Sequence, residues 1–198
     1  MILKKQESID KFIKIYFEHL NSIFKNIDRN KIKNLSLLLE KSRKNNSNVF
    51  VVGNGGSAVN ATAMSNDLGF DILKKTKKKA FKVFSLTDNN AISTAISNDI
   101  GFENIFTSQL KILFEKNDLL IVMSVSGNSK NLLNCAKWVR KKQGKVFGIL
   151  GCNGGKLKRF CNDSIIIPSK IGEFGPVEDL QLIINHILAH WFQITLQK

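Results

Sequence analysis

The chain has 198 residues, of which 43% are hydrophobic and 23% are charged. This composition is ordinary for a folded globular protein and excludes a largely disordered chain, and the length suits a single α/β domain over residues 1–198. No apolar run reaches the roughly 18 residues of a membrane span, and residues 1–7 lack the apolar core of a signal peptide. We therefore expect a cytoplasmic protein with no membrane partner.

The formal net charge is +14, from 30 Lys and Arg against 16 Asp and Glu. A charge of this size could mark a nucleic-acid surface, and its densest cluster is residues 74–79. The lysines are spread through every predicted helix, however, and the aromatic and basic pattern of RNA-binding modules is missing. We attribute the charge to biased composition and expect no nucleic-acid partner.

Hydrophobic periodicity predicts two helices and then an alternation of strands and helices. The N-terminal helix pair covers residues 7–26 and 29–44, within a segment that ends near residue 45. In the core, residues 46–198, strands are predicted at 49–52, 83–86, 119–123, 146–150 and 164–167. Helices are predicted at 57–70, 89–97, 103–114, 130–142 and 176–193. Such alternation predicts a parallel sheet covered by helices on both faces.

A glycine turn follows the first predicted strand. Asn48 to Val52 run directly into Gly53, Asn54, Gly55, Gly56 and Ser57, after which a helical pattern begins. Backbone N–H groups at such a turn, together with the helix dipole, favour phosphate or carboxylate at the carboxyl end of the strand.

A second turn of this kind follows the strand at residues 119–123. It consists of Ser124, Val125, Ser126, Gly127, Asn128 and Ser129. Helix capping alone could explain Ser57 and Ser129, but the second turn holds more small donors than one cap requires. The two turns together predict one anionic ligand held between them.

Three segments carry a resemblance to a known family: residues 53–57, 95–101 and 124–129. They resemble the signature loops of sugar isomerase (SIS) domains, in the phosphoheptose isomerase branch, and the similarity extends over nearly the whole chain. The resemblance implies a three-layer α/β SIS fold with a five-stranded parallel sheet flanked by helices. It also implies a homotetramer whose active sites are shared between subunits.

The resemblance further implies an aldose–ketose isomerase that converts sedoheptulose 7-phosphate to a heptose 7-phosphate for surface polysaccharide synthesis. Such a reaction needs a base and an acid, which the resemblance places at Asp67 and His186, acting from opposite sides of the carbon chain. The matching phosphate ligands are Ser124, Val125 through its N–H, Ser126 and Ser129. The matching sugar contacts are Asn54, Gly55, Gly56, Ser57, Asn98, Asp99 and Glu178.

Three positions depart from the family pattern. The family usually has His, Glu and Gln where this chain has Ala63, Asp67 and Glu178. His and Glu one helical turn apart can share a zinc ion, and Ala63 removes one of these ligands. Asp67, Glu178 and His186 remain as candidate metal ligands, so zinc is a candidate cofactor that the residues do not require. Asp in place of Glu also withdraws the base by about 1.5 Å.

These departures leave two alternatives open. One is a non-catalytic SIS-domain protein of the kind that associates with the bacterial replication initiator, and the other is an isomerase for a different sugar phosphate. Without the resemblance, His186 would be read as a core histidine of an apolar helix, and Glu178 as a carboxylate favoured by a helix N-terminus.

Overall fold

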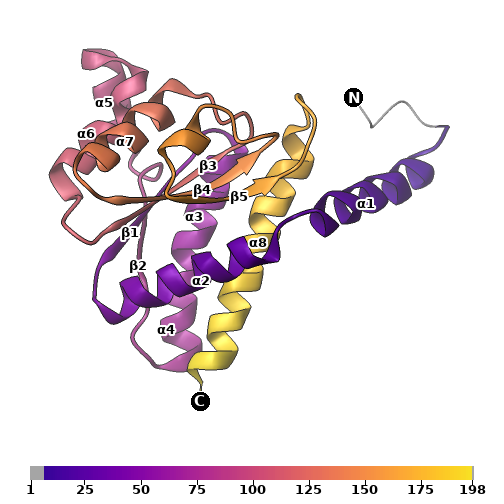
Figure 1. The fold of residues 1–198 in the computed structure, drawn as a ribbon, viewed down its shortest axis with the longest axis horizontal. Helices are drawn as coiled ribbons and strands as arrows, with labels where there is room; N and C mark the ends of the chain where they lie inside the picture. Colours follow the sequence, from indigo (N-terminus) through magenta and orange to yellow (C-terminus); the bar gives the residue numbers. More distant parts are fainter. Residues whose placement is uncertain (1–6, 198) are drawn as a thin grey trace.

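The computed structural model describes residues 7–197, which form a parallel sheet with helices on both faces (Figure 1). Met1–Gln6 and Lys198, which the predicted domain includes, lie outside the described residues. The strands are β1 (Asn48–Val52), β2 (Lys82–Ser85), β3 (Leu119–Ser124), β4 (Lys145–Gly151) and β5 (Asp163–Ile167). The helices are α1 (Ile9–Lys25), α2 (Arg29–Lys44), α3 (Gly56–Leu68), α4 (Phe70–Thr76), α5 (Asn90–Ile100), α6 (Ile105–Leu113), α7 (Lys130–Lys141) and α8 (Phe174–Leu196), with short 3-10 turns η1 (Phe102–Asn104) and η2 (Leu157–Phe160).

The strand order confirms the predicted five-stranded parallel sheet. It is β2-β1-β3-β4-β5, and every neighbouring pair is parallel. The register pairs Val52 of β1 with Val122 of β3, so these two strands end at the same edge. The chain builds the sheet outward in opposite directions from β1 and β3, and ligands of such sheets bind where the order reverses. The glycine turn after β1 and the serine turn after β3, both predicted to bind an anion, therefore lie at this switch point.

Alternate residues of β1 enter two separate cores. Val49 and Val51 pack with α2, α3 and α8 on one face of the sheet, whereas Phe50 and Val52 pack with α6 and α7 on the other. The nearly continuous apolar sequence of β1 follows from this burial on both sides. As a result, the helix after β1 and the helix after β3 leave the switch point on opposite faces.

The N-terminal helix pair is confirmed, with α1 extending away from the body of the molecule in Figure 1. Ser8 caps the N-terminus of α1, and its side chain accepts a hydrogen bond from the N–H of Lys11. Two polar contacts join α1 to the start of α8: His19 Nε2 lies 3.1 Å from Glu173 Oε1, and the Tyr16 hydroxyl donates to Asp179.

One helix was not expected. The predicted helix at 57–70 ends at Leu68, because Gly69 adopts φ −84° and ψ −92° outside the helical region, and α4 follows at once. Ile72 and Thr76 are buried on α4, which packs beside α8. The seven residues of α4 are too few for hydrophobic periodicity to indicate a separate helix.

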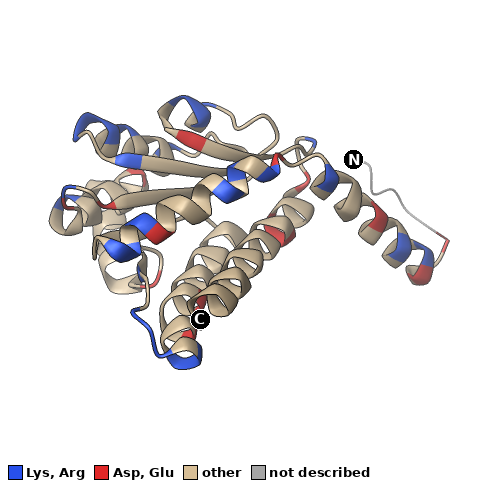
Figure 2. Cartoon of the chain, turned by 60° about the horizontal axis from the view of Figure 1, so that its bottom comes forward, with Lys and Arg blue, Asp and Glu red and all other residues tan. Residues whose placement is uncertain are grey.

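Charge is unevenly distributed over the helices. Helices α3 and α8 contain only Asp67, Glu178 and Asp179 as charged residues, although the chain carries +14 overall. In Figure 2 the two helices are almost entirely uncharged ribbon, while the Lys and Arg segments lie on other elements. No helix within residues 7–197 is long and apolar enough to cross a membrane.

Candidate active site

The glycine turn after β1 places a carboxylate at the start of α3. A Cβ on Gly53 would collide with the backbone of Ser57, and Gly55 has φ +55°, so the turn depends on glycine at both positions. A Cβ on Gly56 would collide with the carboxylate of Glu178, and the Gly56 N–H favours the negative form of that carboxylate. The anion position at the α3 N-terminus is thus taken by the chain's own Glu178.

The surroundings of Glu178 have opposing effects on the pKa of its carboxyl group. Burial and the negative charge of Asp179 raise the pKa of the Glu178 carboxyl above its ordinary value, and the N–H of Gly56 opposes this. Glu178 is half-buried in the first turns of α8. Its negative form disfavours a second anion at the same helix end.

The side chain of Ser57 is buried and points into the protein interior. Its hydroxyl donates to Gln181 Oε1 at 2.9 Å, and both side chains are buried. The Gln181 amide in turn donates to the carbonyl of Ile149 at 3.2 Å, and Asn60 donates to the carbonyl of Glu178 at 2.8 Å. Ser57, a predicted sugar contact, therefore belongs to a hydrogen-bond network that joins α3, α8 and β4. The sequence did not indicate this network.

The serine turn after β3 is ordered by its own hydrogen bonds. Ser124 accepts from the N–H of Gly127 at 3.0 Å, and Ser126 accepts from the N–H of Asn128 at 3.2 Å. Gly127 has φ +65°, and a Cβ there would collide with the carbonyl of Gly154. Ser126 is exposed, and Ser129 caps α7 without a side-chain cap bond. Ser124 and Val125 are buried, so Ser126 and Ser129 are the hydroxyls best placed for a ligand.

A pair of amides joins the two turns. Asn54 Nδ2 donates to Asn131 Oδ1 at 3.0 Å, and Asn131 Nδ2 donates back to Asn54 Oδ1 at 2.8 Å. The predicted neighbourhood of the two turns is thus present in the structure. Asn131 was not among the predicted site residues, although it follows the serine turn within the first turn of α7.

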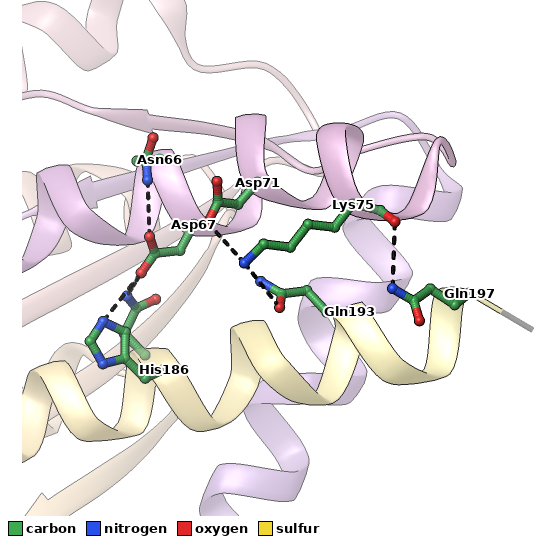
Figure 3. A network of polar contacts seen from close by, with 8 residues as sticks. Asn66, Asp67, Asp71, Lys75, His186, Gln193 and Gln197 are labelled. Atoms are coloured by element: carbon green, nitrogen blue, oxygen red, sulfur yellow. Dashed lines mark hydrogen bonds and ion pairs between the residues drawn. The ribbon is translucent and has the colours of Figure 1, made fainter.

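Asp67 and His186 form a second polar group on the facing sides of α3 and α8 (Figure 3). Asp67 Oδ2 lies 3.6 Å from His186 Nε2 and accepts from Asn185 Nδ2 at 2.6 Å, while Asp67 Oδ1 accepts from Asn66 at 3.0 Å. Solvent reaches 52% of the His186 side chain but only 16% of that of Asp67. The predicted base and acid are therefore adjacent and open to solvent on one side, not opposite each other as expected.

This pair is distant from the two turns of the same chain. Asp67 lies near the C-terminal end of α3, about 16 Å along the helix axis from Gly56 at its start. His186 is likewise about 12 Å further along α8 than Glu178. Asn98 and Asp99, the other predicted sugar contacts, lie exposed at the end of α5 and hydrogen bond to each other.

The candidate zinc ligands are not gathered in one chain. Glu178 lies against Gly56, whereas Asp67 and His186 are paired further along the same helices, and Ala63 offers no donor. Within residues 7–197, no three His, Cys, Asp or Glu side chains are close enough to hold a metal ion. A zinc site needs three or four such donors. The donors of a single chain therefore do not fit zinc, and we derive no step through it.

Comparisons with a family model and with known proteins point to the same family. The SIS domain family matches residues 15–151. The chain is 32% identical over 184 residues to a phosphoheptose isomerase of Leptospira biflexa, covering 93% of this chain and 91% of the relative. It is 30% identical over 179 residues to a phosphoheptose isomerase of Aliarcobacter butzleri, covering 89% and 93%.

Solved structures agree with these sequence matches. A phosphoheptose isomerase from Francisella tularensis superposes with a TM-score of 0.84 at 27% identity, covering 96% of this chain and all of that chain. The predicted three-layer SIS fold is thereby confirmed. The chain belongs to the SIS-domain family and, within it, to the phosphosugar isomerases of the phosphoheptose isomerase branch.

Proposed function

We propose that this protein converts sedoheptulose 7-phosphate to the corresponding heptose 7-phosphate, in the cytoplasm and for surface polysaccharide synthesis. The observation that carries the proposal is the Asp67 and His186 pair, a carboxylate and an imidazole 3.6 Å apart and accessible to solvent. The relatives matched over nearly their whole length are named phosphoheptose isomerases, which supports this substrate.

The proposed reaction uses these two groups in turn. The Asp67 carboxylate removes the proton from carbon 1 of the ketose, the C–H electron pair forms a double bond between carbons 1 and 2, and protonated His186 gives its proton to the oxygen on carbon 2. Asp67 then returns its proton to carbon 2 while His186 takes the hydroxyl proton on carbon 1, giving the aldose. Carbon 1 and the oxygen on carbon 2 are two bonds apart, which suits two neighbouring groups.

Asn185 and Asn66 position the base in this scheme. Asn185 is fully buried, and its amide fixes one oxygen of Asp67 while Asn66 holds the other. A carboxylate held by two amides keeps a fixed orientation, and Asp67 Oδ2 lies 3.6 Å from His186 Nε2.

The distance between this pair and the serine turn bears on assembly. Asp67 lies about 16 Å along α3 from Gly56, at the glycine turn that Asn54 joins to Asn131 beside the serine turn. We infer that a sugar phosphate bound at the serine turn of one chain meets the Asp67 and His186 pair of another chain. We propose that the active protein is a homotetramer with active sites between subunits. Ile183, Ile187, Trp191 and Ile194 support this, since they form an exposed apolar stripe on α8.

Replacing Ile187 by Asp should therefore shift the protein to a smaller species, because a charge would have to be buried in the proposed interface. Size-exclusion chromatography with light scattering measures this directly. Ile112→Asp, at an even more exposed isoleucine on α6, is the control and should leave the wild-type assembly intact. A wild type that is monomeric at micromolar concentration contradicts the proposal.

The function is tested by incubating the purified protein with a panel of ketose phosphates, beginning with sedoheptulose 7-phosphate, and measuring aldose phosphate formation. We expect turnover of sedoheptulose 7-phosphate above that of the other ketoses, and the assay is run with added zinc and with a chelator. Turnover of another ketose alone would assign a different substrate. If no ketose reacts under either condition, the alternative of a non-catalytic SIS-domain protein is favoured.

A further inference from the structure

The loop after β4 is fixed against the serine turn by backbone contacts. The N–H of Leu157 donates to the carbonyl of Gly127 at 2.9 Å, and the N–H of Lys156 donates to Asn128 Oδ1 at 3.1 Å. A Cβ on Gly155 would collide with the carbonyls of Ser126 and Gly127, so only glycine permits this approach. The loop and the turn therefore form one rigid unit, and Lys156 is placed by backbone geometry.

A cavity of about 470 Å³ opens between this loop and the serine turn. Ser126 and Asn128 line it from the turn, Lys156 and Arg159 line it from the β4 side, and Ile171 and Phe174 close it near the start of α8. None of its lining residues is Asp or Glu. Among residues 7–197, neither Lys156 nor Arg159 has a carboxylate within ion-pair distance.

Lys156 and Arg159 could balance the negative charge of a bound phosphate. The serine turn, residues 124–129, is neutral, and a phosphate monoester carries nearly two negative charges at pH 7. The other anion position at the switch point is already occupied by Glu178, whose negative form repels a phosphate. Hydroxyls and N–H groups supply hydrogen bonds but no compensating charge, whereas Lys156 and Arg159 supply two positive charges next to Ser126.

We propose that Lys156 and Arg159 bind the phosphate of the ligand from the β4 side of the serine turn and determine the preference of this site for a dianion. The proposal rests on the proposed function in taking a sugar phosphate as the ligand. Arg159 offers a planar fork of donors to two phosphate oxygens, and Lys156 adds a compact charge. Ser126, which lines the same cavity, adds a hydroxyl donor.

Calorimetric titration with inorganic phosphate and with sedoheptulose 7-phosphate tests this assignment. Lys156→Ala and Arg159→Ala should each weaken the binding of both ligands by about tenfold or more, as expected for hydrogen bonds to a charged group. The wild-type affinity should fall as ionic strength rises, and the double variant should lose most of this dependence. In turnover assays the double variant should show a raised KM with little change in kcat.

Lys158→Ala is the matched control, since Lys158 is exposed on the same short turn η2 but does not line the cavity, and it should bind phosphate like the wild type. Arg159→Lys keeps the charge and should recover part of the loss. The assignment is overturned if the double variant, folded by circular dichroism, binds phosphate as tightly as the wild type, or if the wild type binds no phosphate. Phosphate binding that depends on Lys156 and Arg159 without any ketose turnover would contradict the proposed function and leave the phosphate site standing.

Discussion

Replacing His186 by Ala, or Asp67 by Asn, is expected to lower the turnover of sedoheptulose 7-phosphate by about 10² to 10⁴. General acid–base catalysis typically contributes a factor of this size, and both proton transfers of the proposed reaction pass through this pair. Phosphate binding should remain nearly unchanged, because Asp67 lies about 16 Å along α3 from Gly56, at the glycine turn whose Asn54 contacts Asn131 beside the serine turn. Turnover from a coupled assay and affinity from calorimetry separate the two effects.

His190→Ala is the matched control for this prediction. His190 lies one helical turn after His186 on α8 and is also exposed, yet it makes no contact with Asp67. Its replacement should leave turnover unchanged. Asp67→Glu restores the residue usual in the family and extends the carboxylate by one methylene, so it tests the departure itself. The catalytic assignment fails if folded His186→Ala and Asp67→Asn proteins turn over ketose at the wild-type rate.

Replacing both Ser126 and Ser129 by Ala is expected to weaken sugar-phosphate binding by about 3 to 6 kcal/mol, since each hydrogen bond to a charged group contributes roughly 1.5 to 3 kcal/mol. The two hydroxyls are accessible, and that of Ser129 has no helix-cap bond to give up. Calorimetry with sedoheptulose 7-phosphate measures the loss.

Ser36→Ala serves as the control for the serines. Ser36 lies on α2, where its hydroxyl donates to the Lys33 carbonyl of the same helix at 2.8 Å, so its removal should not affect affinity. The double variant should remain folded, because the one hydrogen bond it removes within the turn, from the Asn128 N–H to Ser126, lies at the exposed surface. An unchanged affinity would remove these serines from the ligand shell.

The sheet could be predicted from the sequence because its signals are local. The strands are short, mostly apolar runs, and in β1 the run Val49 to Val52 is buried on both sides of the sheet. The glycine turn and the serine turn could also be predicted, because each consists of consecutive small and polar residues. Helix α4 was not predicted because its seven residues are too few for helical periodicity to indicate a separate helix.

The site was less predictable because its contacts join distant parts of the chain. Ser57 meets Gln181 across 124 positions, and Asn54 meets Asn131 across 77. Local sequence cannot show that Ser57 donates inward or that Glu178 occupies the start of α3. The axial distance between Asp67 and the glycine turn follows from helix geometry alone, whereas the pairing of Asp67 with His186 depends on the packing of α3 against α8.

The central claim is that Asp67 and His186 isomerise a ketose phosphate, and proton NMR of sedoheptulose 7-phosphate incubated with the wild type and with His186→Ala tests it most directly. The anomeric proton of an aldose phosphate, absent from the ketose, reports the product. We predict that this signal grows to equilibrium with the wild type and at least a hundredfold more slowly with His186→Ala. Equal growth with both proteins, or no aldose signal with the wild type, would contradict the account.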